Sequence, residues 1–498
     1  MRALGVGEMR SVRRWAVGRR GMGGALLALA LLLPAVGVGA SAASGSTPGA
    51  DTPVAWSPCP KVAGYQCGTL RVPLDYAHPS RGSVALAVME RPVAQSKGVI
   101  VFNPGGPGES GVLILPILAM FMPQAVQDQY TFVSFDERGT GASEHLDCGP
   151  SAAAASSAVA GTAAATRTFA DVEHSCQAAS PSLFPTVNTT TSARDMDRLR
   201  AALGVGKIGY YGMSYGTVLG SVYAHLFPSH VRTMILDGAV DTNLSLASDA
   251  AADATAMETA LTRQLADCAG KPGCPAGGAE ALYRQVQQRL TATPLPAPGG
   301  GDSLPVTVGD LYTATLLYLS APSLTPGYFP ALTAAAAGNG APLRSVALGL
   351  ENDIDGQSLV GPLWTIACGD VTGHPGGAAA AALARTLAAH DPLIGAEAVS
   401  NYLIGCAGWG ASPHAVAHLS PNGAPAPLVI GNVYDPNTPY PIAPKLAAAT
   451  GGRLVTYVGD GHTWLLNGSK NACMQQVVTS YLVDGTLPAP RTQCSSTP

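Results

Sequence analysis

A serine lies between two glycines in the segment KIGYYGMSYGTVLG, residues 207–220. Ser214 follows a short apolar run that is typical of a strand and precedes a stretch that is typical of a helix. A tight strand-to-helix turn of this kind can expose a nucleophilic serine, and flanking glycines leave room for its strained backbone. The alternative is a turn that simply requires small residues. A G-x-S-x-G match also arises by chance in a glycine-rich chain, so other segments must decide between a nucleophilic serine and an ordinary turn.

Two later segments supply the partners that a nucleophilic serine needs. A serine hydroxyl attacks well only when a histidine accepts its proton and an acid orients that histidine. Asp435 in VIGNVYDPNTPY and His462 in VTYVGDGHTW each follow an apolar run, and their separation of 27 residues leaves room for one helix and one strand. The order serine, acid, histidine is the one expected when the nucleophile lies on a strand-to-helix turn and its partners follow later strands. We therefore predict a triad of Ser214, Asp435 and His462, and expect the competing acid, Asp460, to point elsewhere.

A glycine-rich loop, FNPGGPGESG at 102–111, follows another apolar run. The oxyanion that forms during attack by a serine needs backbone N–H donors, one from the residue after the nucleophile and one from such a loop. The first donor would be Tyr215. Because the prolines of the loop have no N–H, one of its glycines must supply the second, and we select Gly106. A merely flexible turn is the alternative, whereas the G-x-G-x-x-G pattern of a dinucleotide site does not fit well.

The elements that must position these residues alternate between strands and helices. The apolar runs that we interpret as strands are 98–103, 130–136, 207–211, 231–238, 426–432 and 453–459. A helix is predicted at 192–204, with Ser192 as its N-cap, and others follow the serine and the two later strands. This alternation predicts an α/β fold with a mainly parallel sheet flanked by helices.

The pattern changes in the middle of the chain. Residues 243–410 are rich in alanine, with helical stretches broken by proline and glycine, and we interpret them as a helical lid or cap insertion. The sequence then divides into a signal peptide at 1–43, the N-terminal part of the core at 44–242, this insertion, and the C-terminal part of the core at 411–498, which carries the acid and the histidine.

The first residues predict export. Arginines precede the apolar run ALLALALLLPAV, and the small residues Ala40-Ser41-Ala42 form a cleavage candidate, which together are typical of a secretory signal peptide. The run is shorter than the roughly 20 residues of a membrane span. We therefore expect a secreted protein, with the general and twin-arginine export routes both left open. The net charge of −4 and the absence of a polybasic run disfavour nucleic acid as a partner.

Ten cysteines follow the leader, and an even number in an exported chain favours disulfides over metal ligands. Pairing each cysteine with its neighbour in the sequence would close five loops. The ten are Cys59, Cys67, Cys148, Cys176, Cys268, Cys274, Cys368, Cys406, Cys473 and Cys494. No Cys/His set has zinc-ligand spacing. We expect neither a metal nor a cofactor.

Five motifs in this order, NPGGPG, DERGTGAS, GMSYG, DPNTP and GDGHT, resemble those of the α/β-hydrolase peptidases related to prolyl aminopeptidase. Within them the chain is most similar to the secreted bacterial tripeptidyl aminopeptidases, from about Trp56 to the C-terminus. The resemblance implies the α/β-hydrolase fold, the same triad and oxyanion donors, and release of short peptides, typically tripeptides, from a free N-terminus. Prolyl aminopeptidases have histidine where Pro104 stands. This difference argues against release of single prolines and favours the tripeptidyl branch.

An aminopeptidase must bind a protonated amine, and a carboxylate in a partly desolvated pocket is the physical means. The candidates in the insertion are Glu351, Asp353, Asp355 and Asp370. We select Asp370, because its segment ACGD lies beside Cys368, which a disulfide would fix. The alternative is that Asp370 is a solvated surface acid.

The function that we predict is that of a secreted serine exopeptidase that releases short peptides from free N-termini through an acyl-enzyme. One alternative is a secreted carboxylesterase or lipase with the same triad. Another is a hydrolase fold without activity that serves as a binding module, which the complete set of triad residues disfavours. The partners that we expect are peptide or protein N-termini, with no nucleic acid, no stable membrane association and a monomeric state.

Overall fold

The computed structural model describes most of the chain after its first 52 residues. The described residues are 53–146, 148–149, 163–241, 245–269, 274–299, 304–324, 326–351, 359–371, 373–395, 405–407, 409–410, 416, 419 and 423–496. They belong to one contact unit, residues 48–498. The predicted signal peptide, its cleavage site and residue 243, the predicted start of the insertion, lie outside the described residues.

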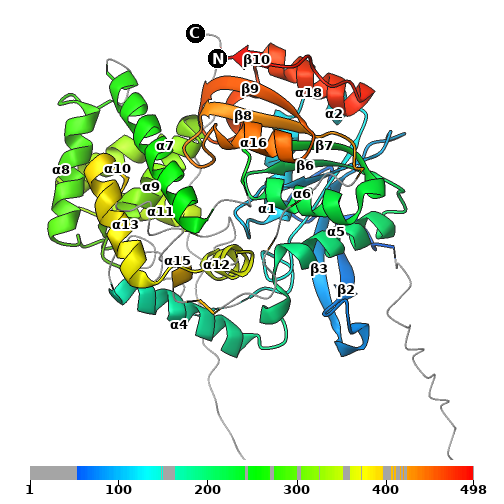
Figure 1. Ribbon diagram of the computed structural model, residues 1–498, viewed down its shortest axis with the longest axis horizontal. Helices are drawn as coiled ribbons and strands as arrows, with labels where there is room; N and C mark the ends of the chain where they lie inside the picture. Colours follow the sequence, from blue (N-terminus) through cyan, green and yellow to red (C-terminus); the bar gives the residue numbers. More distant parts are fainter. Residues whose placement is uncertain are drawn as a thin grey trace, which may run out of the picture. The chain divides into compact units, whose positions relative to one another are not determined.

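Ten strands of the described residues form one sheet, in the order β1-β2-β3-β5-β4-β6-β7-β8-β9-β10 (Figure 1). The strands are β1 (Ser57–Pro58), β2 (Gln66–Pro73), β3 (Ser83–Arg91), β4 (Val99–Asn103), β5 (Thr131–Phe135), β6 (Ile208–Met213), β7 (Val231–Asp237), β8 (Leu428–Tyr434), β9 (Arg453–Asp460) and β10 (Thr492–Ser495). The pairs from β1 to β3 and the pair β3–β5 are antiparallel, and all later pairs are parallel. The predicted mainly parallel sheet is confirmed.

Burial explains which strands the sequence revealed. Every residue of β4, β5 and β6 is buried, as expected for parallel strands with both faces covered, and such strands appear as continuous apolar runs. In contrast, β2 and β3 alternate between buried and more exposed positions, which is typical of antiparallel strands with one solvated face. These two strands, and the short edge strands β1 and β10, are the part of the sheet that the sequence analysis did not identify.

Helices cover both faces of the sheet. On one face, α5 (Thr189–Ala202), α6 (Gly216–Leu226) and α16 (Ile442–Ala449) share an apolar core with the strands. On the other face, α1 (Gly111–Phe121), α17 (Trp464–Gly468) and α18 (Ala472–Asp484) share a second core. Helix α2 (Gln124–Gln127) lies beside α18. This two-sided arrangement is the α/β-hydrolase fold, with the site residues at the carboxyl ends of the strands.

The start of α5 differs from the prediction. The helix begins at Thr189, and its N-cap is Asn188, whose side chain accepts a hydrogen bond from the N–H of Thr191. Ser192, the predicted N-cap, lies inside the helix and is buried. Asparagine and serine are about equally good N-caps, so composition alone could not separate the two positions.

A helical region lies between β7 and β8 in the sequence, shown in green to yellow in Figure 1. Its helices are α7 (Leu246–Asp267), α8 (Ala279–Ala292), α9 (Val308–Ser320), α10 (Tyr328–Ala336), α11 (Ala341–Glu351), α12 (Val360–Gly369), α13 (Gly377–His390) and the short α15 (Gly405–Ala407). They pack around an apolar core of their own, which also includes residues of α4 (Ala163–Ala179). The exact limits of the insertion and of the other predicted parts stay a prediction.

Five disulfides join the ten cysteines. The bonds are Cys59–Cys67, Cys148–Cys176, Cys268–Cys274, Cys368–Cys406 and Cys473–Cys494. The predicted pairing of sequence neighbours is confirmed. Disulfides persist mainly in oxidising compartments, so these bonds indicate an exported protein. Within the described part of the chain, no helix is both long enough and apolar enough to span a membrane.

A buried ion pair joins the loop after β5 to α5. The Arg138 guanidinium donates to both carboxylate oxygens of Asp195, from Nε at 2.7 Å and from Nη2 at 2.6 Å, and neither side chain is exposed. Arg138 also donates to the carbonyl oxygens of Pro73 and Leu74 at the end of β2. The Arg138 and Asp195 side chains have both left water, so each depends on the other for its hydrogen bonds.

We predict that Arg138→Met lowers the free energy of unfolding by about 3–5 kcal/mol, because Asp195 would stay buried without its cation. The matched control is Arg284→Met, which removes an exposed pair with Glu280 at 2.9 Å and should cost about 0.5 kcal/mol or less. Urea unfolding followed by circular dichroism, with disulfides intact, measures both. Equal effects of the two substitutions would contradict the importance of the buried pair.

Candidate active site

Ser214 occupies the turn between β6 and α6. Its φ of 54° lies in the left-handed region, which is rare for a residue with a side chain and costs conformational energy. The backbone holds it there: its N–H donates to the carbonyl oxygen of Asp237 at 2.9 Å, and its carbonyl oxygen accepts from the Thr217 hydroxyl at 2.7 Å. This strand-turn-helix setting is the one that presents a serine hydroxyl as a nucleophile.

Glycine is required on both sides of this turn. A Cβ atom on Gly212 would lie 2.2 Å from the carbonyl oxygen of Gly216. A Cβ atom on Gly216 would lie 2.8 Å from both the backbone and the side-chain oxygen of Asn103. Both distances are shorter than any normal contact, so the segment cannot accept larger residues without moving. The two glycines of the motif therefore have a steric reason.

His462 and Asp435 are in direct contact. Asp435 follows β8, and His462 comes two residues after β9. The imidazole Nδ1 lies 2.9 Å from Asp435 Oδ1 and 3.1 Å from Oδ2. The carboxylate is fully buried, and the histidine side chain is 12% exposed. Asp435 bonds to Nδ1, so Nε2, on the opposite side of the ring, can accept a proton. This is the arrangement of a general base.

Three backbone N–H groups fix the Asp435 carboxylate. Asn437 and Thr438 donate to Oδ1, both at 2.9 Å, and Thr463 donates to Oδ2 at 3.2 Å. The first two belong to the loop of the acid itself, and the third follows the histidine. The acid therefore ties the two loops together in addition to orienting the imidazole.

Ser214 and His462 approach the same stretch of backbone. Ser214 N–H bonds to the Asp237 carbonyl, and a Cβ atom on the next residue, Gly238, would lie 3.2 Å from His462 Cε1. The φ of Gly238 is +75°, which also favours glycine there. Neighbouring parallel strands from β6 to β9 thus bring the three predicted triad residues to one edge of the sheet. Asp460 instead pairs with Arg263 of α7, at 3.1 Å from Nε and 3.2 Å from Nη2.

The glycine loop lies against the serine. A Cβ atom on Gly105 would be 3.0 Å from the Cβ of Ser214 and 3.3 Å from the nitrogen of Tyr215. The N–H of Gly105 donates to the Asn103 side-chain oxygen at 3.2 Å. Gly106 is exposed, and within the described residues its N–H has no hydrogen-bond acceptor. Of these two glycines, Gly106 is the one whose N–H is available to a ligand.

Asp370 lies at the C-terminal end of α12 and is half-buried. Its Oδ1 accepts from the N–H of Thr189 at 3.2 Å, and its Oδ2 accepts from the Thr189 hydroxyl, which also bonds to the hydroxyl of Tyr215. Burial raises the pKa of Asp370 to about 7, although the bonds from Thr189 act in the opposite direction. Asp370 is therefore linked through one side chain to the residue after Ser214. The candidates Asp353 and Asp355, and the side chain of Glu351, lie outside the described residues.

Sequence reasoning missed two acids near the histidine. Glu109, on the glycine loop, is half-buried, and burial raises its pKa to about 6 while the charge of His462 lowers it. Asp237, at the end of β7, is buried and accepts from the N–H groups of Trp464 and Leu465 at 2.9 and 3.1 Å. It therefore holds the start of α17, directly after His462. An acid that ends a buried strand beside the predicted site was the signal available in the sequence.

The charges around His462 determine its pKa. Burial disfavours the charged imidazolium, but the charge and the hydrogen bond of Asp435, with smaller contributions from Asp237 and Glu109, outweigh burial and raise the pKa of His462. A base with a raised pKa binds a proton more readily, and the adjacent carboxylate stabilises the imidazolium that results.

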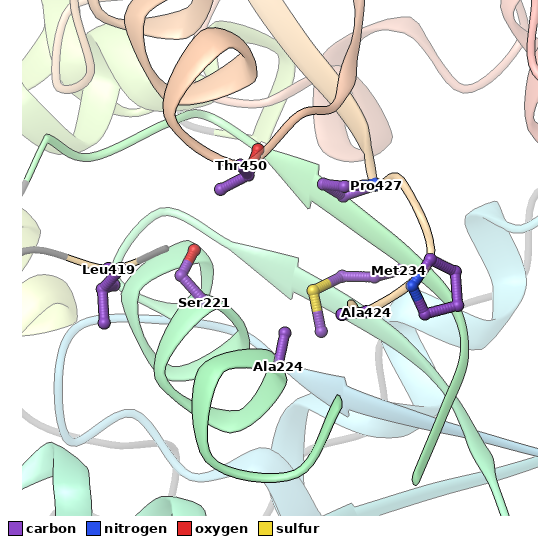
Figure 2. Close-up of a pocket in the computed structure, with 8 residues that line it drawn as sticks. Ser221, Ala224, Met234, Leu419, Ala424, Pro427 and Thr450 are labelled. Atoms are coloured by element: carbon purple, nitrogen blue, oxygen red, sulfur yellow. The ribbon is translucent and has the colours of Figure 1, made fainter. Parts of the chain in front are cut away.

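A small pocket of the protein lies away from these residues. Figure 2 shows it between α6, which contributes Ser221 and Ala224, and β7, which contributes Met234. Pro427 and Thr450 line the other side. The lining has no titratable side chain, so it offers none of the groups needed for acid–base chemistry. Within the described residues, no set of three His, Cys, Asp or Glu side chains is placed to hold a metal ion.

We predict that His462 titrates above the usual histidine pKa of about 6.5, and that Asp435→Asn moves it below that value, because burial would then be opposed only by the smaller contributions of Asp237 and Glu109. An NMR titration of the imidazole signals of protein labelled at histidine Cε1 measures this, with His462→Ala to assign the signal. Glu109→Gln should cause a smaller decrease. An unchanged pKa in Asp435→Asn would contradict the assigned contact.

Comparison with known proteins identifies two matching family models. Residues 98–319 match the model described as alpha/beta hydrolase fold, and residues 391–494 match the model described as TAP-like protein. Serine protease Hip1 of Mycobacterium tuberculosis is 31% identical over 510 residues, which cover 94% of this chain and 96% of that protein. Carboxylesterase B of the same species is 30% identical over 522 residues, which cover 96% and 99%.

A third relative, the tripeptidyl aminopeptidase of Streptomyces coelicolor, is 36% identical over 192 residues, or 35% of each chain. The likeness to serine protease Hip1 extends over nearly the whole of both proteins. The glycine loop and Ser214 lie in the first family match, and Asp435 and His462 lie in the second. The chain therefore belongs to the α/β-hydrolase serine peptidases.

Proposed function

We propose that this serine hydrolase is an exported exopeptidase that releases short peptides, in the first instance tripeptides, from free N-termini through an acyl-enzyme. It acts as a monomer on peptide or protein N-termini and requires neither metal nor cofactor. The observation that carries the proposal is the Nδ1 contact of His462 with the buried Asp435, at 2.9 Å, beside the backbone that holds the strained Ser214.

In the proposed mechanism, Ser214 Oγ attacks the carbonyl carbon of the scissile bond while His462 Nε2 takes the hydroxyl proton. The imidazolium is stabilised by Asp435, and the N–H groups of Gly106 and Tyr215 stabilise the oxyanion. When the tetrahedral intermediate collapses, His462 returns the proton to the leaving amine. Water then attacks the acyl-enzyme with the same histidine as base, and the short peptide leaves.

Asp370 is the proposed anchor for the substrate's protonated amine. Its half-buried carboxylate belongs to the helical region, and Thr189 connects it to Tyr215, next to the nucleophile. Burial has raised the pKa of Asp370 to about 7, and the positive charge of an ammonium group would stabilise its ionised form. Support for an aminopeptidase comes from the tripeptidyl aminopeptidase relative and from the TAP-like match at 391–494.

A carboxylesterase is the second candidate. The relative named carboxylesterase B matches nearly the whole chain, and the same three residues can hydrolyse an ester. The two functions differ in what they require of the acyl portion. An aminopeptidase needs a free amine at a fixed distance from the scissile bond, whereas an esterase has no use for that charge.

We predict that Ser214→Ala reduces hydrolysis of a tripeptide p-nitroanilide by about 10⁴-fold or more, because the nucleophile and the proton transfer are lost together. Release of p-nitroaniline measures it. Circular dichroism of the variant should match the wild-type protein, since the serine hydroxyl is not needed for packing. Full activity in a correctly folded Ser214→Ala protein would contradict the catalytic proposal.

We predict that acetylating the substrate's N-terminal amine lowers kcat/KM by about 10- to 100-fold, the value of a charge-assisted hydrogen bond. Asp370→Asn should cause a similar decrease for the free substrate and none for the acetylated one. Glu109→Gln is the matched control, since it removes the half-buried carboxylate of the glycine loop. If acetylation has no effect in the wild-type enzyme, the esterase alternative gains support. If Glu109→Gln shows the pattern instead, Asp370 is not the anchor.

A further inference from the structure

Glu137 is a buried acid that the proposed mechanism does not use. It follows β5 and is 1% exposed, so its carboxyl group has no access to water. Burial raises the pKa of Glu137 to about 8, and the charge of Asp370 acts in the same direction, while bonds from Asn103 and Tyr215 oppose it. At neutral pH the neutral acid therefore predominates, and a buried acid of this kind needs a reason to be present.

The first contact of Glu137 leads to the glycine loop. The Asn103 side-chain NH₂ donates to Glu137 Oε1 at 2.7 Å, and the oxygen of the same amide accepts from the N–H of Gly105 at 3.2 Å. The amide group is planar, so a bond that fixes its nitrogen also fixes the direction of its oxygen. Glu137 thereby sets the orientation of the Pro104–Gly105 peptide, which is one peptide before the one that carries the N–H of Gly106.

The second contact leads to the other side of the serine. The hydroxyl of Tyr215 lies 3.5 Å from Glu137 Oε2, the outer limit of a hydrogen bond, and its shorter contact is with Thr189. Tyr215 is 7% exposed, so these contacts hold it among buried groups. The Glu137 carboxyl group therefore lies between the side chain of Asn103, which contacts the glycine loop, and the side chain of Tyr215, the residue after Ser214.

We propose that Glu137 is a positioning residue for the oxyanion hole. It holds the N–H of Gly106 in place through Asn103, and the N–H of Tyr215 through the tyrosine side chain. The proposal rests on the proposed function, because it presupposes that Ser214 is the nucleophile. Glu137 itself does not touch the substrate. Donors fixed before the reaction stabilise the developing charge without reorganisation, so their alignment affects the transition state more than the ground state.

Two substitutions at Glu137 test this idea. Glu137→Met keeps the length of the side chain but removes the acceptor for Asn103, whereas Glu137→Gln keeps the shape, a carbonyl acceptor for Asn103 and a donor in place of the acid O–H. We expect Glu137→Met to lower kcat by about 10- to 100-fold with KM within about twofold, since misaligned donors mainly weaken transition-state binding. Glu137→Gln should stay within about threefold of the wild-type enzyme.

The matched control is Glu258→Met. Glu258 of α7 accepts from the N–H groups of Leu393 and Ile394, both at 3.0 Å, in the helical region away from Ser214. Its removal should leave kcat unchanged. Titration with a fluorophosphonate gives the fraction of each protein with a reactive serine, so rates are compared per active molecule and partial unfolding cannot imitate the effect.

Inhibitor affinities separate positioning from general damage. A tripeptide aldehyde reacts with the serine to form a tetrahedral adduct whose oxygen lies in the oxyanion hole. The free tripeptide product forms no such adduct. In Glu137→Met the affinity for the aldehyde should fall by the same factor as kcat, and the affinity for the product should not change. The proposal is wrong if both affinities fall equally, if Glu137→Met keeps the wild-type kcat, or if Glu137→Gln is as slow as Glu137→Met.

A p-nitrophenyl ester distinguishes this failure from a failure of the proposed function. Ester hydrolysis by the same serine also passes through an oxyanion. If the wild-type protein cleaves esters but no peptides, the exopeptidase proposal fails, and the decrease in Glu137→Met with the ester still tests the positioning role. If peptides are cleaved and the decrease is absent with both substrates, only the positioning role fails.

Discussion

The contact between the Asp435 carboxylate and the His462 imidazole is the interaction on which the site depends. A buried carboxylate is costly unless its oxygens find donors, and here three N–H groups and the imidazole supply them. The acid, the histidine and their two loops are therefore one polar unit inside an apolar fold. Parallel strands make this possible, because their carboxyl ends meet at one edge of the sheet and place loops from distant parts of the chain side by side.

The residues that carry chemistry were accessible to sequence reasoning because their signals are local. Ser214 is marked by steric demands on glycines only two residues away. Asp435 follows β8, whose first five residues are buried, and His462 follows β9, whose residues alternate between buried and partly exposed. The resemblance of five ordered motifs added the family. These signals predicted the α/β fold and the edge of the sheet where the three side chains lie.

The supporting residues were not accessible in the same way. Asp237 acts on Trp464, 227 residues later, and Glu137 acts on Asn103 and Tyr215, 34 residues before it and 78 after it. Each acid ends or follows a buried strand, and Glu137 lies in the DERGTGAS motif, but neither local signal indicates which distant residues the acid contacts. The N-cap of α5 was misplaced for a related reason, since Asn188 and Ser192 are equivalent by residue type, and the path of the chain selects one of them.

One backbone contact couples the helical region to the chemistry. The N–H of His462 donates to the carbonyl oxygen of Ser320 at 2.9 Å, at the last residue of α9, and the Ser320 hydroxyl accepts from the side chain of Asn437 at 2.8 Å. Asn437 and His462 lie on the loops of the acid and the base. A displacement of the end of α9 would thus remove bonds from both loops at once. The same serine therefore supports the loop of the acid and the loop of the base, so the position of the end of α9 affects the alignment of the Asp435–His462 pair.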